Sequence, residues 1–479
     1  MIALRHNSDK TVTVIGGGVA GMSAACALAE AGLRVQLVER RGYLGGRASS
    51  YLHPGVGEVI DNCQHVIFAC CSNILGFYRR IGVVHRIHWT SDMTMIEPGG
   101  RRTRLGPFEL GPIRLPAPLH TAPSFMSAHA FTLKDKLALG RAMRAMLRPE
   151  AMIDTGESLG EWLRRHNQTD GALNRFWRLA IASALNADID SLSVPYATKI
   201  IREGFLNSAE GGKMGMSTVP LSDLYAGVRT FLEQRQSGVH LNSNVDSAEW
   251  EEETSQWTVS TSSGALVSDF LVLALPFEAT AKLLPHMPPA NVGALAGQLA
   301  HHEHWPICSV HLWFDREITD LDHAVLLDRE IHWMYNKGKF QTGRRQSGSY
   351  LELVVSASRG FAALSREQAI AQAVSELAEY FPAVVEAKLE KAALVKEMRA
   401  TFGVPPGIDA SRPTSASPWP NCFLAGDWIA TGWPSTMESG ARSGHLAAEA
   451  VCAAVGEPRS ILNADLKATG LTRVLEARL

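Results

Sequence analysis

The sequence has few cysteines and almost no net charge. It contains only seven cysteines in 479 residues, and no two of them form a CxxC pair. This usage argues against a disulfide framework or a cysteine zinc site, and it indicates a reducing, cytosolic compartment. The formal net charge of −2 gives no reason to expect a nucleic-acid partner. The histidine-rich segment His301–His304 lacks the spacing of a zinc motif, so we expect no bound metal.

The sequence also lacks an uninterrupted apolar stretch that could cross a bilayer as a helix. Thr11–Ala29 carries no charge, but three consecutive glycines, Gly16–Gly18, disfavour a continuous apolar helix. Leu115–Leu133 is also uncharged, and three prolines interrupt it. We therefore expect neither a signal peptide nor a membrane-spanning helix in these two segments.

The N-terminal segment has the pattern of a dinucleotide-binding βαβ unit. Thr11–Ile15 is a short β-branched run, and Gly16–Gly21 after it fits GxGxxG. Val19–Ala31 is typical of a buried helix, and Arg34–Val38 of a second buried strand. Glu39 then follows, where its carboxylate can accept hydrogen bonds from ribose hydroxyls and disfavours a 2′-phosphate. The combination predicts a Rossmann-type site; the alternative is a glycine-rich turn in an ordinary βαβ unit.

Each position of the glycine motif has its own physical role. Gly16 allows the tight turn, Gly18 lets a pyrophosphate approach the backbone, and Gly21 lets the helix pack close to the strand. The free N–H groups at the helix start, those of Val19 and Ala20, point toward the phosphate. We expect all five residues to belong to the cofactor site.

Two further segments resemble motifs of the flavin amine oxidase and phytoene desaturase superfamily. Arg40–Arg47 ends in Gly-Gly-Arg, and Asn421–Trp428 is an apolar run that leads into Gly-Asp. The resemblance implies FAD as the cofactor, held by close backbone approach, by a guanidinium at the diphosphate and by a carboxylate near the ribityl chain. It assigns Gly45, Gly46, Arg47, Gly426 and Asp427 to the FAD site.

A helix is expected to begin at the end of Gly432–Glu438. The resemblance places its start, with Trp433 and Met437, beside the flavin, where the helix dipole stabilises the reduced state. The middle of the chain contributes Val245, whose backbone amide corresponds to the one that binds adenine in the superfamily.

The middle of the chain also contains short runs in which apolar and polar residues alternate as in strands, and polar turns separate these runs. The expected strands are Val239–Val245, Ala248–Glu251, Trp257–Thr261 and Phe270–Ala274. We therefore expect an α/β fold, in which a FAD-binding Rossmann-type (GR2-like) domain is interleaved with an α+β substrate domain. The FAD-binding domain is expected to take residues 1–95, 235–285 and 415–460, and the substrate domain residues 96–234 and 286–414.

Four segments together resemble the hydroxysqualene dehydroxylases of bacterial hopanoid synthesis, also called squalene-associated FAD-dependent desaturases. They are Asp61–Val66, Cys70–Gly82, Leu115–His120 and Gly432–Glu438. The resemblance implies reduction of hydroxysqualene, a C30 isoprenoid lipid, to squalene, with loss of water and oxidation of reduced FAD. A general acid would help the hydroxyl leave, and Asp61, His65 and Glu438 are the candidates because their motifs abut the flavin. Gln64 and His65 are expected to run past the isoalloxazine.

Three other functions remain open. A carotenoid-type desaturase or isomerase would use the same parts on a similar substrate, and a flavin amine oxidase would take a polar one. A flavin-free prenyl-lipid carrier shares the Rossmann core, but the Gly-Asp motif and Arg47 argue against it. No second GxGxxG with an acidic partner is visible, so we expect no dedicated nicotinamide domain. Reduction of the flavin by an external donor and direct reduction at the flavin face both remain open.

A C30 lipid substrate requires contact with a membrane, and residues 107–148 are the candidate. Thr132–Arg148 has the pattern of a basic amphipathic helix beside a proline-rich loop. Its apolar residues are Leu133, Leu137, Met143, Met146 and Leu147, and its basic residues are Lys134, Lys136, Arg141, Arg144 and Arg148. We expect a cytoplasmic protein bound peripherally to the inner face of the cytoplasmic membrane. The alternative is a surface helix packed on the substrate domain.

Overall fold

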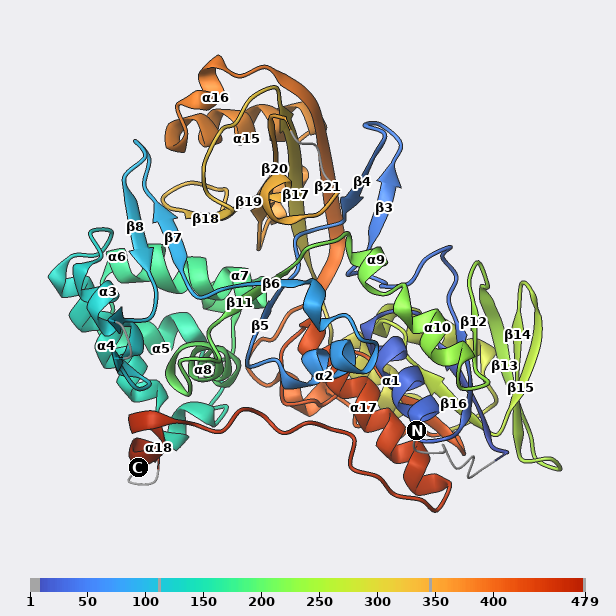
Figure 1. Cartoon of the computed structure of the whole chain (residues 1–479). Helices are drawn as coiled ribbons and strands as arrows, with labels where there is room; N and C mark the ends of the chain where they lie inside the picture. Colours follow the sequence, from blue (N-terminus) through green and yellow to red (C-terminus); the bar gives the residue numbers. More distant parts are fainter. Residues whose placement is uncertain (1–8, 111–112, 344–346, 477–479) are drawn as a thin grey trace.

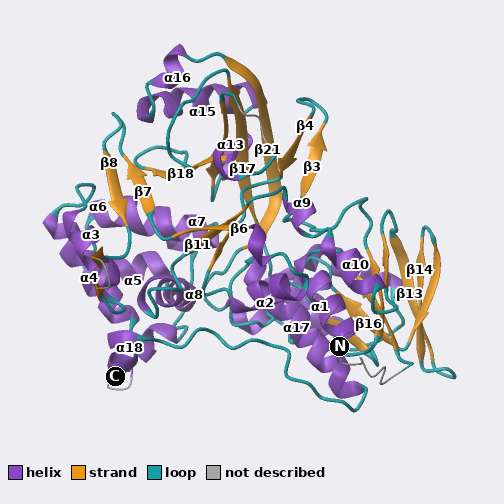
Figure 2. Cartoon of the chain, in the orientation of Figure 1, coloured by secondary structure: helices purple, strands orange, loops and turns teal. Residues whose placement is uncertain are grey.

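A five-stranded parallel sheet organises the first part of the molecule (Figures 1 and 2). The computed structural model describes residues 9–110, 113–343 and 347–476. The strand order is β12-β2-β1-β16-β22. The strands are β1 (Thr11–Ile15), β2 (Arg34–Val38), β12 (Gly238–His240), β16 (Phe270–Leu273) and β22 (Cys422–Leu424). The sheet thus unites the N-terminal, middle and C-terminal parts of the chain.

Two helices pack against each other over this sheet (Figure 1). They are α1 (Val19–Glu30) and α17 (Met437–Ala454). Gly444 makes the close approach possible, because a Cβ there would collide with the carbonyl oxygen of Ala20. Further contacts with α1 come from α2 (Ser72–Arg80) and α10 (Gly227–Glu233).

A separate antiparallel meander lies beside this sheet, in the order β13-β14-β15. Its strands are β13 (Val245–Glu251), β14 (Gln256–Thr261) and β15 (Gly264–Ser268). The expected single strand Val239–Val245 is wrong. The chain leaves β12 after His240 and turns at Asn242, whose φ is +53°, so that Val245 begins a different sheet. Asn tolerates this left-handed conformation better than most residues.

The second large sheet has seven strands, in the order β21-β17-β20-β19-β18-β7-β8. Helices α15 (Arg366–Tyr380) and α16 (Ala383–Glu386) lie beside this sheet, at the top of Figure 1. The strands are β7 (Met93–Ile96), β8 (Arg102–Leu105), β17 (His304–Phe314), β18 (His323–Leu326), β19 (Trp333–Asn336), β20 (Ser349–Val355) and β21 (Leu389–Phe402).

The expected domain boundaries differ from the structure at two points. β7 pairs within the seven-stranded sheet, so the chain leaves the first domain before residue 93 rather than at 95. α10 packs on α1, so the chain returns before residue 227 rather than at 235. Both differences arise because sheet pairing and helix packing, which the sequence does not show directly, decide domain membership.

A group of helices fills the space below the second sheet in Figure 1. It includes α3 (Ala122–Ser127), α4 (Leu133–Met146), α5 (Leu159–Arg165), α6 (Asp170–Ala172), α7 (Ala182–Leu185), α8 (Val194–Ile201), and the π-helical segments η4 (Leu173–Ile181) and η6 (Arg202–Leu206). The chain after α17 runs back to this group and ends in α18 (Gly470–Glu476), where Thr469 and Leu471 donate backbone hydrogen bonds to Asn207 and Ala117.

Short elements connect these parts. The strands are β3 (Ser50–His53), β4 (Glu58–Asp61), β5 (Val66–Phe68), β6 (Ile87–Thr90), β9 (Glu109–Leu110), β10 (Ile113–Arg114) and β11 (Met214–Ser217). The helices are α9 (Leu221–Leu224), α11 (Phe277–Leu283), α12 (Gly293–Ala300), α13 (Lys337–Phe340) and α14 (Arg359–Ala363). Among the helices that the structure describes, none is both long and apolar enough to cross a bilayer.

Candidate functional site

One cavity of about 1770 Å³ connects the two domains. It begins at the glycine turn after β1, passes between the two large sheets and reaches α3 and α4. Pockets for single ligands usually measure about 300–1,000 Å³, so this cavity has room for a dinucleotide and a second large molecule. Of the residues predicted to bind the cofactor, Gly21 is the only one that does not line it.

The turn after β1 forms the nucleotide end of the cavity. Gly16 has a φ of +110°, and a Cβ there would collide with the carbonyl oxygen of Ala274. A Cβ at Gly18 would come within 4 Å of only one atom, the Cα of Gly46 at 4.0 Å, so it would project into the space a ligand needs. The N–H groups of Val19 and Ala20 open α1 beside this space.

Glu39 lies at the end of β2 on the same wall. Its two carboxylate oxygens accept backbone hydrogen bonds from Gly17 and Arg41, each at 2.8 Å. Each oxygen retains a lone pair for a ribose hydroxyl. Val245 lines the cavity nearby, where β13 begins. Together with Gly18, these residues fit the adenosine half of FAD.

An ion pair joins the two flavin motifs. A guanidinium nitrogen of Arg47 lies 2.5 Å from Asp427 Oδ1, and Ser435 donates a hydrogen bond to the other oxygen of Asp427. Burial alone would raise the pKa of Asp427, but Arg47 holds it below its usual value, so the carboxylate stays ionised. Arg47 also donates to the carbonyl of Ala400 in β21. Arg47, which is predicted to bind the diphosphate of FAD, is therefore held in position by Asp427 of one domain and the Ala400 carbonyl of the other.

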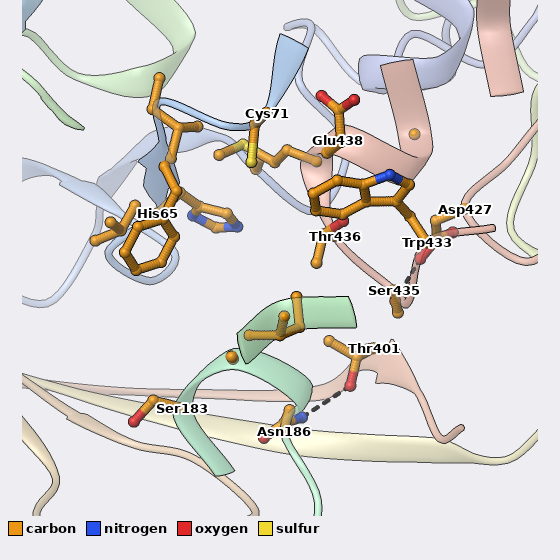
Figure 3. A pocket seen from close by; sticks show the side chains of 18 of the residues that line it. His65, Cys71, Ser183, Asn186, Thr401, Asp427, Trp433, Ser435, Thr436 and Glu438 are labelled. Atoms are coloured by element: carbon orange, nitrogen blue, oxygen red, sulfur yellow. Dashed lines mark hydrogen bonds between the residues drawn. The ribbon is translucent and has the colours of Figure 1, made fainter. Parts of the chain in front are cut away.

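The start of α17 forms the next part of the wall. Thr436 caps the helix by accepting a hydrogen bond from the backbone N–H of Ser439. Met437 lines the cavity at this helix start, and so does the buried Trp433, which Figure 3 shows beside Thr436. Gln64 faces the same space, and its Oε1 is buried without a hydrogen-bond partner among the described residues. An unpaired buried amide oxygen in the same cavity as a helix N-terminus fits the polar edge of a flavin ring.

His65 projects into the cavity, as Figure 3 shows. Its Nδ1 lies 2.8 Å from the carbonyl oxygen of Cys63. A carbonyl only accepts, so Nδ1 donates and Nε2 is left as an acceptor. Burial lowers the pKa of His65, which keeps the ring neutral. His65 is therefore suited to accepting a proton, not to the predicted role of general acid.

The prediction that Asp61 is an acid conflicts with its surroundings. Its side chain lies behind the cavity wall, where Lys337 Nζ is 2.6 Å from Oδ2. Burial alone would raise its pKa, but Lys337 and hydrogen bonds from Ser50 and Leu221 hold the pKa well below its usual range. Lys337 also pairs with the buried Glu352 at 3.0 Å. Asp61 therefore stays ionised and ties β4 to α13 and β20.

Glu438 also has a structural partner. Its carboxylate accepts hydrogen bonds from the backbone N–H groups of Asn73 and Ile74 at the start of α2. Burial raises its pKa, and these hydrogen bonds oppose the rise. Although Glu438 borders the cavity, its oxygens are occupied by α2, so it links α17 to α2 and is poorly placed to act as an acid.

Two important residues were missed by sequence reasoning. Arg412 is buried, and its guanidinium donates to the carbonyls of Asp427, Ile429 and Trp433, which fixes the C-terminal flavin loop. Glu203 lines the cavity in η6. A carboxylate between the apolar pairs Ile200–Ile201 and Phe205–Leu206 was the available signal for it, whereas nothing local marked Arg412.

The side chains of His302 and His304 both pack against the ring of Phe277. His304 lies 3.2 Å from Glu278, and the ring of His302 packs edge-on against Phe402. Across the described part of the chain, no three His, Cys, Asp or Glu side chains are grouped as metal ligands.

Comparisons with known proteins agree with this geometry. A family model described as flavin containing amine oxidoreductase matches residues 19–452. The chain is 27% identical to 15-cis-phytoene desaturase of Synechococcus elongatus, over 92% of this chain and 96% of that protein. It is 25% identical to a probable zeta-carotene desaturase of the same organism, over 92% of this chain and 98% of that one.

Solved structures share the fold. Cyclohexylamine oxidase from Brevibacterium oxydans has a TM-score of 0.67 at 18% identity, covering 94% of this chain and all of that one (100%). A triple mutant of putrescine oxidase has a TM-score of 0.69 at 17% identity, covering 93% and 99%. The chain therefore belongs to the family of flavin-containing amine oxidoreductases, and it is an FAD-dependent oxidoreductase.

Proposed function

We propose that this protein exchanges hydride between FAD and a long isoprenoid lipid. The observation that carries the proposal is the part of the cavity beyond His65 and Trp433, which continues to α3 and α4. Its walls there are mostly apolar, with Phe125, Met143, Leu147, Phe176, Leu179 and Trp333 among the lining side chains. Such a wall suits a flexible hydrocarbon and gives a small charged amine few partners.

The reaction proposed first is the reductive dehydroxylation of hydroxysqualene to squalene. The C–O bond breaks, the hydroxyl takes up a proton and leaves as water, and reduced FAD supplies the hydride that forms the new C–H bond. Two of the segments that resemble the dehydroxylases support this choice, because they contribute Gln64, His65 and Trp433 to the cavity wall. A two-electron donor outside this chain must then reduce the FAD.

The second candidate is carotenoid-type desaturation, in which FAD accepts hydride from one carbon while a base removes a proton from its neighbour. The names of the relatives support this candidate more directly than dehydroxylation. Nε2 of His65 would serve as the base, because it is an acceptor directed into the cavity.

Peripheral membrane binding belongs to the same proposal. Leu133 and Leu137 of α4 are 63% and 58% exposed, Lys134 and Arg141 are exposed on the same helix, and Arg148 is exposed two residues after its end. Exposed leucines beside basic side chains suit the surface of an anionic bilayer. Met143 of α4 lines the cavity, so a lipid could pass between the bilayer and the site along this helix. Residues 111–112 of the segment 107–148 lie outside the described residues.

Two anaerobic reactions separate the candidates. Photoreduced protein is mixed with hydroxysqualene, and oxidised protein with phytoene, each in liposomes. Squalene formed in proportion to flavin oxidation supports dehydroxylation, whereas phytoene that reduces the flavin and gains conjugated double bonds supports desaturation. Free FAD in the same liposomes is the control. Reaction with putrescine or cyclohexylamine alone would contradict both candidates.

A further inference from the structure

Glu203 lies in the wall between two cavities. It belongs to η6, the π-helical segment that directly follows α8. One side of this wall is the main cavity, and the other is a second cavity of about 550 Å³. Lys467 and Arg473, both exposed, line the second cavity, so it reaches the solvent side of the protein. π-helical turns are rare and are frequent at functional sites.

The carboxyl of Glu203 is buried and only half satisfied. Glu203 is 7% exposed, and its Oε1 lies 3.3 Å from Lys199 Nζ. Its Oε2 is buried and has no hydrogen-bond partner among the residues that the structure describes. An ionised carboxylate rarely leaves a buried oxygen unpaired, because the lost solvation is costly. A protonated carboxyl tolerates this position better.

The charged residues around Glu203 do not remove the preference of its carboxyl for the protonated form. Lys199 lies closer to Asp465, at 2.6 Å, than to Glu203, and Asp465 also pairs with Arg442 at 2.8 Å. Burial raises the pKa of Glu203; Lys199 and Arg202 oppose the rise, and Asp465 adds to it. The net effect is a raised pKa, which holds a proton on Glu203 at a higher pH than usual.

The same cluster contacts the flavin motif. Lys199 Nζ lies 5.2 Å from the centre of the Trp433 ring, and the Trp433 indole donates to Asp465 at 3.1 Å. Trp433 and Glu203 line the same main cavity. Glu203 therefore lies near the part of the cavity that Trp433 lines.

We propose that Glu203 is the proton donor of the reaction, and that the second cavity is the route by which it regains its proton from solvent. This inference rests on the proposed dehydroxylation. The Oε2–H bond breaks and its proton goes to the substrate hydroxyl, which leaves as water as the C–O bond breaks. The hydride of the new C–H bond comes from reduced FAD. Glu203 remains as a carboxylate, and Lys199 at Oε1 stabilises it until a solvent proton arrives.

The test compares the wild type with Glu203→Gln in anaerobic single turnovers of photoreduced protein with hydroxysqualene. General acids contribute about 10²–10⁴-fold, so we expect flavin oxidation and squalene formation to slow by about 100-fold or more. The wild-type rate should fall as pH rises through the raised pKa of Glu203, and Glu203→Gln should lose this dependence. Glu210→Gln, which changes an exposed glutamate in the turn after η6, is the matched control and should react like the wild type.

A second readout does not depend on turnover. Infrared difference spectra of wild type and Glu203→Gln at neutral pH should show one protonated carboxyl band that only the wild type has. Bound-flavin absorbance verifies that the variant folds. If the wild type forms squalene and Glu203→Gln matches its rate and pH dependence, the inference is overturned while the proposed function stands. If the carboxyl band is absent, the inference also fails. If the wild type forms no squalene, the proposed dehydroxylation and the inference on Glu203 fail together.

Discussion

Arg412 determines the shape of the loop that carries Asp427 and Trp433. Its guanidinium donates hydrogen bonds to carbonyls spread over that loop, and the rings of Tyr196 and Phe402 lie 5.5 Å and 5.3 Å from its central carbon. A planar fork of five donors is needed to serve carbonyls in several directions. Arg412 therefore fixes the conformation of the flavin loop from behind, since it does not line the cavity itself.

We predict that Arg412→Gln loses most of its bound FAD and unfolds at a lower temperature. Each buried carbonyl left unpaired costs about 1–3 kcal/mol, and several would be left. The ratio of flavin to protein absorbance and the thermal midpoint measure the effect. Arg366→Gln, which removes an exposed arginine bound to one carbonyl, should change neither. A fully loaded Arg412→Gln variant would contradict this role of Arg412.

The buried pair of Lys337 and Asp61 predicts a dependence of stability on pH. Lys337→Met should lower the unfolding free energy by about 3–5 kcal/mol, because it leaves buried carboxylates uncompensated. The pKa of Asp61 is lower in the folded than in the unfolded protein, so this stabilisation is present above about pH 4 and is lost as pH falls below it.

Thermal unfolding from pH 7 to pH 3 measures this dependence. The wild type should lose stability on acidification, and Lys337→Met should lose less because its stabilising pair is already absent. Lys391→Met, which breaks an exposed pair with Glu58, is the control and should cost no more than about 1 kcal/mol. Equal losses in the two lysine variants would refute the assignment.

At the scale of elements, the contact of α1 with α17 aims two helix N-termini at one cavity. The contact depends on Gly444, where a Cβ would collide with the Ala20 carbonyl and approach the Ala24 nitrogen at 2.8 Å. At Gly440, one turn earlier, a Cβ would meet Val19 at an ordinary 3.5 Å. Although both glycines lie on the face of α17 that meets α1, only Gly444 is required for the close packing of the two helices.

We predict that Gly444→Ala destabilises the protein by about 1–3 kcal/mol, because the helices must separate. Gly440→Ala should be neutral or stabilising by up to about 1 kcal/mol, because alanine favours a helix. Chemical denaturation of the two variants measures the difference. A similar loss in both would show that the close approach is not the cause.

We predict that helix α4 contributes to the binding of anionic membranes. Changing two exposed basic residues of α4 and one just after its end to Gln should reduce binding to anionic liposomes, by about 1 kcal/mol per residue, in a sedimentation assay. These residues are Lys134, Arg141 and Arg148. The control changes three basic residues of equal charge elsewhere, Lys10, Arg229 and Arg459, and should bind like the wild type. Unchanged binding by the α4 variant would remove α4 as the anchor.

At the scale of the whole molecule, the cofactor bridges segments that are distant in sequence. Removal of FAD should therefore lower the thermal midpoint, and added FAD should restore it; saturation at 100 times the dissociation constant stabilises by about 2.7 kcal/mol. Differential scanning calorimetry of the apo and reconstituted protein measures this. An apo protein with an unchanged midpoint would contradict the bridging role.

Local elements could be predicted from the sequence, whereas contacts between distant parts of the chain could not. The βαβ unit from Thr11 to Val38 was predicted almost to the residue, because strand, glycine turn and helix are encoded locally. The pairing of Asp61 with Lys337 and the capping of α2 by Glu438 were not, because both partners are far apart in sequence. Glu203 was hidden for the same reason, since its environment is formed by the C-terminal segment that returns past η6.

The order of strands in the five-stranded sheet has a consequence for biosynthesis. β1 emerges first from the ribosome, but its neighbour β16 comes from the middle of the chain, and the edge strand β22 and α17 come near its end. The edge of β1 that pairs with β16 therefore stays unpaired while the first half of the chain is made. The five-stranded sheet cannot be completed until translation is almost finished. The flavin site is complete only after β22 and α17 have been synthesised, so flavin uptake is expected to follow translation.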